Sequence, residues 1–343
     1  MNDELKSKRL SLRVPRLAFI VSFCLCAFLI TATQAQKKEG GTLFPVRQDG
    51  KWGYINKAGE VIIKPQFDDA WDFSEGLAYA RLGNRRGIID QTGQWVVDLQ
   101  QVDFAGRFSE GLAPVQTGGL SPRRGFIDKA GRIVIAPQFD AVESFEQGLA
   151  LVMIDRKYGF VDKTGKTVIK PQFDKAYPFH DGLALVIVNN KHGYIDKKGR
   201  LVIPAEYNNA YHFSEGLANV KIDQKYGFIN KAGKVAIKPQ FDFTGTFSEG
   251  LAPIILDSKY GYVDKTGKLI IQPQFEWTGG FSEGLALITD KRRYGYIDRS
   301  GKVVITPQYD NALPFSNSVA KVWLKGKHGY IDRSGNLIWK PTK

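Results

Sequence analysis

The chain has 343 residues, of which 43% are hydrophobic and 24% are charged, and its formal net charge is +13. This composition is that of a folded globular protein and excludes a disordered or collagen-like chain. The positive charge indicates anionic partners but carries no information about the fold.

The first 35 residues are typical of a secretory signal peptide. Five Lys or Arg residues precede an apolar run over residues 17–30, and small residues follow at Thr33 and Ala35. We therefore predict cleavage after Ala35 and export to the periplasm or the medium. The alternative is a membrane anchor through residues 17–33, although the apolar run is shorter than the roughly 20 residues that cross a bilayer.

Both cysteines, Cys24 and Cys26, lie inside this segment. The predicted mature chain, residues 36–343, therefore has no thiol for a disulfide, for nucleophilic catalysis or for a metal ion. After cleavage it is also predicted to have no membrane span.

The remainder of the chain is a tandem repeat. Its period is 34 residues, with one step of 38, and it is followed most easily on one glycine per unit: Gly53, Gly87, Gly125, Gly159, Gly193, Gly227, Gly261, Gly295 and Gly329. Nine units account for essentially all of residues 36–343, which we therefore treat as one domain.

Each unit is predicted to consist of strands, because Gly and Pro divide it into short pieces rich in β-branched and aromatic residues. In the unit spanning 148–182, strands are expected at 149–154 (LALVMI), 158–162 (YGFVD) and 166–170 (KTVIK). The intervening DKTG sequence is typical of a hairpin turn opened by Asp and closed by Gly. The sequence thus predicts a three-stranded antiparallel meander followed by a linker.

The linker contains the hexapeptide FSEGLA or a close variant in eight units. Its phenylalanine is expected to fill the seam between units: Phe73, Phe108, Phe145, Phe179, Phe213, Phe247, Phe281 and Phe315. Chemistry requires one asymmetric set of groups, whereas these groups recur with every unit, so we interpret the hexapeptide as scaffold.

The sequence KWGYINKAGEVIIKPQFDDAWDFSEGLA resembles the bacterial WG repeat, and the resemblance extends over about residues 43–341. Only Trp52 keeps the tryptophan before the glycine, which argues against a chemical role for that side chain. The resemblance implies a β-rich repeat array, common in exported bacterial proteins, that mediates interactions and has no known activity.

Two all-β architectures fit nine such units. A closed propeller often completes one blade with strands from both chain ends, whereas here all nine meanders are whole, from LFPV to NLIWK. We therefore predict an open, twisted, solenoid-like array, with a large closed β-propeller as the alternative.

The sequence contains few residues in patterns typical of catalysis or metal binding. His192 and His328 stand beside the repeat glycine, and His180 and His212 lie in equivalent linkers, so all four are interpreted as packing or surface residues. The aspartates before each turn are interpreted as turn initiators. No phosphate loop or metal motif is found, and we predict no catalytic residue, no metal and no cofactor.

One candidate binding feature is a cationic ladder. The residue two positions before the repeat glycine is basic in all nine units: Lys51, Arg85, Arg123, Lys157, Lys191, Lys225, Lys259, Arg293 and Lys327. These side chains are expected at hairpin tips, either as an anion-binding stripe or as simple protection against edge pairing.

The second candidate is a set of aromatic residues at positions that vary between units. They are Trp71, Tyr177, Tyr211 and Trp277. Core positions should repeat, so these side chains are expected either on a binding face or in local seam packing.

Together these features predict an exported, non-enzymatic scaffold that binds a protein or an anionic polymer of the cell envelope. The alternative function is a glycan hydrolase whose carboxylates come together across units. Nucleic acid is not expected as a partner, because a signal peptide directs the chain away from the cytoplasm. The oligomeric state is left open.

Overall fold

The computed structural model describes residues 41–99, 102, 104–119 and 121–342. The predicted signal peptide and its cleavage site lie outside these described residues. Gly40–Lys343 forms one compact unit, and its described part is all-β, as the sequence predicts. Among the described residues, no helix is long and apolar enough to cross a bilayer.

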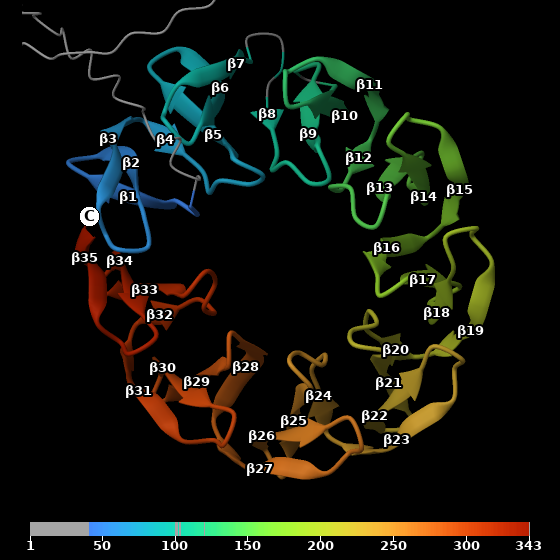
Figure 1. Ribbon diagram of the computed structural model, residues 1–343. Coiled ribbons are helices and arrows are strands. Elements are labelled where there is room, and N and C mark those ends of the chain that lie inside the picture. Colours follow the sequence, from blue (N-terminus) through green and yellow to red (C-terminus); the bar gives the residue numbers. More distant parts are fainter. Residues whose placement is uncertain (1–40, 100–101, 103, 120, 343) are drawn as a thin grey trace, which may run out of the picture. The chain divides into compact units, whose positions relative to one another are not determined.

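The strands form nine small antiparallel sheets arranged around a central opening (Figure 1). Blade 1 contains β1–β3 among the described residues, blade 2 contains β4–β7, and the pattern of four strands continues to blade 9 with β32–β35. The first strand of each four-stranded blade lies nearest the opening and the last lies at the periphery.

The strand bounds repeat closely from blade to blade. The innermost strands are β4 (Asp69–Ala70), β8 (Phe104–Ala105), β12 (Ala141–Val142), β16 (Lys175–His180), β20 (Asn209–Ala210), β24 (Phe243–Thr244), β28 (Trp277–Ser282) and β32 (Asn311–Ala312). The second strands are β1 (Phe44–Gln48), β5 (Leu77–Leu82), β9 (Leu112–Thr117), β13 (Leu149–Ile154), β17 (Leu183–Val188), β21 (Leu217–Ile222), β25 (Leu251–Leu256), β29 (Leu285–Asp290) and β33 (Val319–Leu324).

The third strands carry the repeat glycine, and the outermost strands, except β7, carry the following proline. The third strands are β2 (Lys51–Ile55), β6 (Arg85–Asp90), β10 (Arg123–Asp128), β14 (Lys157–Asp162), β18 (Lys191–Ile195), β22 (Lys225–Asn230), β26 (Lys259–Asp264), β30 (Arg293–Asp298) and β34 (Lys327–Asp332). The outermost strands are β3 (Val61–Phe67), β7 (Trp95–Asp98), β11 (Ile133–Phe139), β15 (Thr167–Phe173), β19 (Leu201–Tyr207), β23 (Val235–Phe241), β27 (Leu269–Phe275), β31 (Val303–Tyr309) and β35 (Leu337–Thr342).

The predicted turns form as expected. The Asp162 carboxylate accepts hydrogen bonds from the Thr164 and Lys166 backbone N–H groups at 2.9 and 3.1 Å, which fixes the turn between β14 and β15. The aspartates before the turns are therefore turn initiators, and their carboxylates are already occupied.

The repeat glycine is needed because two strands approach closely. A Cβ atom on Gly159 would lie 2.5 Å from the Ile169 carbonyl oxygen, at the irregular pairing between β14 and β15. Pro171 follows in β15, at the periphery of the blade, where a missing N–H group is tolerated. This close approach explains why the glycine recurs in every unit.

The expectation of three-stranded units is wrong for eight of the nine blades. The linker contributes a further strand, as shown by the pairing of Ala141 with Met153 and of Val142 with Val152. Most of these innermost strands contain only two residues, which is too short to leave a period-two pattern in the sequence.

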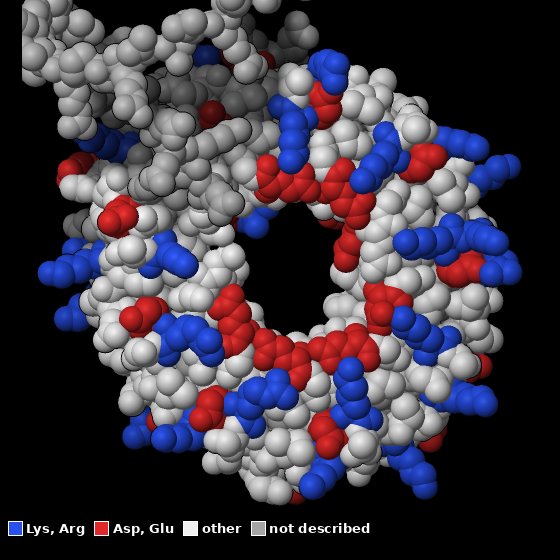
Figure 2. Space-filling model, viewed as in Figure 1, with Lys and Arg blue, Asp and Glu red and all other residues white. Residues whose placement is uncertain are grey.

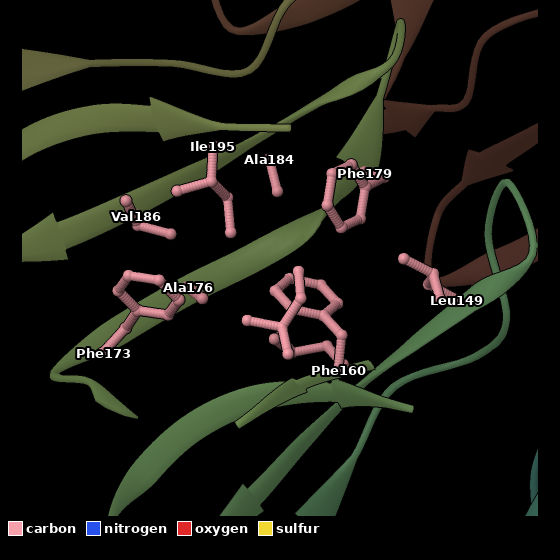
Figure 3. Close-up of a cluster of buried hydrophobic side chains, with 10 residues drawn as sticks. Leu149, Phe160, Phe173, Ala176, Phe179, Ala184, Val186 and Ile195 are labelled. Atoms are coloured by element: carbon pink, nitrogen blue, oxygen red, sulfur yellow. The ribbon is translucent and has the colours of Figure 1, made fainter. Parts of the chain in front are cut away.

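The core lies in the seams between blades. Figure 3 shows the seam between blades 4 and 5, where Phe179 packs against Phe160 with their ring centroids 4.8 Å apart. The predicted seam phenylalanines are buried, with exposed fractions of 1% to 3%, except for the partly buried Phe73. Their predicted role is confirmed, and each isolated blade would expose a face that its neighbour covers.

The prediction of an open array is also wrong, because Gly40–Lys343 is a closed, nine-bladed β-propeller (Figure 1). Val46 and Ile55 of blade 1 share a core cluster with Val319 and Tyr330 of blade 9. The Tyr330 hydroxyl donates a hydrogen bond of 2.8 Å to the Pro45 carbonyl oxygen.

Closure occurs without strand exchange because blade 9 offers blade 1 the same kind of face that every other blade offers its neighbour. Gly59, in the turn of blade 1, packs against Ile338 on the outermost strand of blade 9, and Gly165 of blade 4 likewise packs against the outermost strand of blade 3, there at the Ile135 side chain. Whole units at both ends of the chain therefore do not exclude a closed ring.

Phe179→Ala should lower the free energy of unfolding by about 3 to 5 kcal/mol, because it removes a fully buried aromatic ring from the seam. Urea denaturation of the two proteins measures the difference. An unchanged midpoint would show that this seam is not part of the core.

His328→Tyr should weaken the pH dependence of stability. His328 stacks on Trp52 across the closing seam, and burial, with help from Lys321 and Arg47, lowers the pKa of His328 from 6.5 to about 4. A lowered pKa means that stability is full above pH 6.5 and is lost as the pH falls toward 4, by about 1 to 2 kcal/mol after allowance for partial exposure.

Tyrosine stands at the equivalent position in four other units and does not titrate in this range. Urea midpoints at pH 7 and pH 4 should therefore differ more for the wild type than for the variant. Equal differences would exclude His328 as a source of acid sensitivity.

Candidate functional site

The hexapeptide hydroxyl and carboxylate groups are used to hold neighbouring blades together. The Ser109 hydroxyl of blade 3 donates a hydrogen bond of 2.6 Å to the Phe145 carbonyl oxygen of blade 4, and Ser214 bonds Phe247 in the same way at 2.7 Å. This contact joins one hexapeptide to the next and confirms the interpretation of the motif as scaffold.

The acidic position of the hexapeptide makes a second link. Glu215 of blade 6 accepts a hydrogen bond of 3.0 Å from the Gly250 N–H group of blade 7, and the Lys265 ammonium group of blade 7 lies 3.0 Å from the same carboxylate. The equivalent acceptors and backbone donors are Glu75–Gly111, Glu110–Gly148, Gln147–Gly182, Asp181–Gly216, Glu249–Gly284 and Glu283–Ser318. We call these links the rim braces.

Figure 2 shows acidic side chains gathered around the central opening, with basic side chains outside them. One of these rim carboxylates, Glu75, is held ionised. Burial opposes ionisation of Glu75, but hydrogen bonds from Lys129 and from the Gly111 N–H group outweigh it and lower the pKa of Glu75. Glu75 is therefore a hydrogen-bond acceptor that is also salt-bridged to Lys129.

A second set of braces lies at the other end of the strands, at the hairpin tips. Asp174, in the linker to blade 5, accepts hydrogen bonds from the Lys157 ammonium group of blade 4 at 2.6 Å and from the Asn189 N–H group of blade 5 at 3.3 Å. The equivalent ion pairs are Lys51–Asp68, Arg123–Asp140, Lys225–Asp242 and Arg293–Asp310. We call these the tip braces.

The cationic ladder therefore lies along the hairpin tips of the blades. Most of its members form ion pairs with aspartates. Five of its nine residues belong to tip braces, and Arg85 lies 3.7 Å from Asp98. Lys191 donates to the Asn208 side-chain oxygen at 2.5 Å. Within the described part of the chain, Lys191, Lys259 and Lys327 have no carboxylate partner.

The four candidate aromatic residues lie on or beside the innermost strands of blades 2, 5, 6 and 8, so the structure does not bring them into one site. Trp71 packs against Tyr79 with ring centroids 5.2 Å apart, and Trp277, which is 38% exposed, lies 6.0 Å from Tyr294. The two tyrosines, Tyr177 and Tyr211, are partly buried in neighbouring blades.

The structure brings two of the four histidines together. The rings of His180 and His212 lie 4.5 Å apart, and His180 Nδ1 is 2.8 Å from the Glu146 carboxylate. Burial, and then the neighbouring His180, lowers the pKa of His212. Among the described residues, however, no group of three His, Cys, Asp or Glu side chains could hold a metal ion.

A pocket of about 270 Å³ lies where blades 9, 1 and 2 meet, with one lining residue, Arg107, from blade 3. It is lined by Pro45, Trp52, Ala70, Trp71, Asp72, Arg107 and Lys321. Of these residues only Trp71 was a candidate from the sequence. Lys321 is the most unusual, because burial lowers the pKa of its ammonium group, partly offset by Asp72.

Lys321 could have been found from the repeat itself. The same position in other units holds residues such as Leu151, Leu185, Pro253 and Leu287, so a lysine there breaks an otherwise mainly apolar column. Variable positions occur on the strands as well as in the linkers, and Lys321 is one of those on a strand.

Comparison with solved structures supports the fold alone. A eukaryotic initiation factor crystal structure matches 87% of this chain and 95% of its own at 10% identity, with a TM-score of 0.61. BamB from Moraxella catarrhalis matches 85% of this chain and 92% of its own at 10% identity, with a TM-score of 0.43. No curated protein matches the chain significantly.

Comparison with protein families identifies the family of the chain. The profile described as the WG containing repeat matches eight times, over residues 52–85, 87–120, 125–158, 158–191, 193–226, 226–260, 260–290 and 294–327. These matches follow the blades in order and cover most of the chain. The protein therefore belongs to the family built from the WG containing repeat.

Proposed function

We propose that this protein is an exported, non-enzymatic scaffold that binds a protein or an anionic polymer of the cell envelope. The observation that carries the proposal is that its repeated polar groups are already engaged with each other. Rim braces and tip braces tie the blades together in order from blade 1 to blade 9, which makes a stiff ring suited to presenting surfaces.

The alternative of a glycan hydrolase has weaker support. Such an enzyme needs one carboxylic acid whose pKa is raised so that it can donate a proton. Burial opposes ionisation of Asp181, yet hydrogen bonds from Lys231 and the Gly216 N–H group lower its pKa, as happens for Glu75. The turn aspartates are occupied by backbone N–H groups.

An anionic polymer is favoured as one class of partner by the ring of basic residues at the tips and by the net positive charge that the mature chain keeps, which is +10 because residues 1–35 carry +3 of the +13. Paired members of the ladder would have to leave their aspartates to bind it. Lys191, Lys259 and Lys327 are not held by a carboxylate of the described residues, so they are the members that we expect to contact the polymer.

Retention on immobilised polygalacturonate over a salt series tests this assignment. The triple variant Lys191→Gln, Lys259→Gln, Lys327→Gln should elute at lower salt than the wild type, because fewer counterions are released on binding. Stability should change by about 0.5 kcal/mol per site at most, since these side chains are at the surface.

The matched control is Lys51→Gln, Lys157→Gln, Lys225→Gln, which removes three lysines of the tip braces. It should elute close to the wild type, because those charges are already neutralised by aspartates. If both triple variants elute with the wild type, the ladder does not bind the polymer and serves only to brace the tips.

A further inference from the structure

Blade 1 differs from every other blade of the ring. Among the described residues it has three strands, and the innermost strand that pairs with the second strand of blades 2–9 has no counterpart beside β1. The 270 Å³ pocket lies at this place, between β1, the innermost hairpin of blade 2 and β33 of blade 9.

The other seams show what normally occupies this position. Leu185 on the second strand of blade 5 packs with Ala210 on the innermost strand of blade 6, and Leu287 packs with Ala312 in the same way. Where this position is polar, it reaches the backbone: the Asn219 amide donates a hydrogen bond of 2.8 Å to the Thr244 carbonyl oxygen on β24.

The tyrosine after the repeat glycine also normally contacts the innermost strand region of the next blade. The Tyr296 hydroxyl donates to the Leu313 carbonyl oxygen, which follows the innermost strand of blade 9, at 2.8 Å. At the closing seam, Tyr330 instead donates to Pro45 on the second strand of blade 1. Among the described residues, the closing seam thus lacks the innermost-strand partner that the other seams have.

The positive charge of Lys321 indicates which charge a segment in this seam should carry. Its position is equivalent to Leu185 and Asn219, so its ammonium group points to the seam that an innermost strand would enter. It lies over the rings of Trp52 and Trp323 at 5.9 and 5.3 Å from their centroids. No carboxylate of the described residues pairs with it, because the nearby Asp72 is engaged with Arg107.

A partly buried cation without a counterion is unfavourable, and a ligand that brings a carboxylate relieves this cost. We propose that the pocket receives an extended acidic segment of a partner protein, which adds to β1 as the innermost strand of blade 1 and places a carboxylate against Lys321. This inference rests on the proposed binding function and names one partner class and its site.

The sequence that precedes β1 does not match this site. In repeat register, Lys37, Lys38 and Glu39 stand where the next unit has Trp71, Asp72 and Phe73. Two lysines are like-charged with Lys321, and a charged residue stands at the register position of the seam phenylalanine. An acidic segment complements the charge of Lys321 better.

The direct test is the binding of labelled octapeptides to the purified full chain, measured by fluorescence anisotropy. The probes alternate Thr and Val and carry one central Glu, the same Glu with backbone N-methylation, or Gln in its place. The Glu peptide should bind, and the Gln and N-methylated peptides should bind at least about tenfold more weakly.

Lys321→Leu should weaken binding of the Glu peptide by about tenfold or more, whereas Lys321→Arg should retain it. Leucine is the residue of three equivalent positions, so this variant should fold, which its melting temperature checks. Lys221→Leu, on β21 of blade 6, is the matched control and should bind as the wild type does. Retention on polygalacturonate should be the same for all these variants, which separates this site from the ladder.

Three results would overturn the proposal. Equal binding of the N-methylated peptide would exclude strand addition. Binding of digalacturonate but not of the Glu peptide would assign the pocket to acidic sugars. Binding of the peptide only after deletion of residues 36–39 would mean that the chain itself competes for the site and that no partner segment is captured.

Discussion

The structure depends on the contact that each seam phenylalanine makes with the preceding blade. Phe179 against Phe160, and Phe315 against Tyr296, have their ring centroids 4.8 Å apart, and both phenylalanines are buried almost completely. A blade of four short strands cannot bury enough apolar surface alone, so its stability comes from the neighbour on each side. Closing the ring gives the first and last blades a neighbour as well.

The packing of each blade against its neighbours also determines where the polar groups of the repeat lie. At most seams, side-chain oxygens of the hexapeptide and of the linker accept hydrogen bonds from backbone N–H groups of the next blade, and these oxygens are mainly those of carboxylates. Groups that look reactive in the sequence are therefore structural acceptors. Specific function is to be sought where the repeat is broken, as at Lys321, and not where it is regular.

Much of the local structure could be predicted from the sequence. The strand expected at 149–154 is β13, the DKTG turn forms around Asp162, and the seam phenylalanines are buried. Closure could not be predicted, because it depends on small rotations between blades that no residue pattern encodes, and because Tyr330 and Pro45 meet across almost the whole chain. The two-residue innermost strands are too short to show a period, and the pairing of the ladder with aspartates depends on spatial positions that only the blade geometry sets.

The closed ring is tested most directly by the distance between its first and last blades. Spin labels at Lys57→Cys and Leu337→Cys, in a chain with Cys24 and Cys26 replaced by Ser, lie beside Gly59 and Ile338, which contact each other across the closing seam. Pulsed electron paramagnetic resonance should give one narrow, short distance. A broad distribution of long distances, as expected for the two ends of an open array, would contradict the closed propeller.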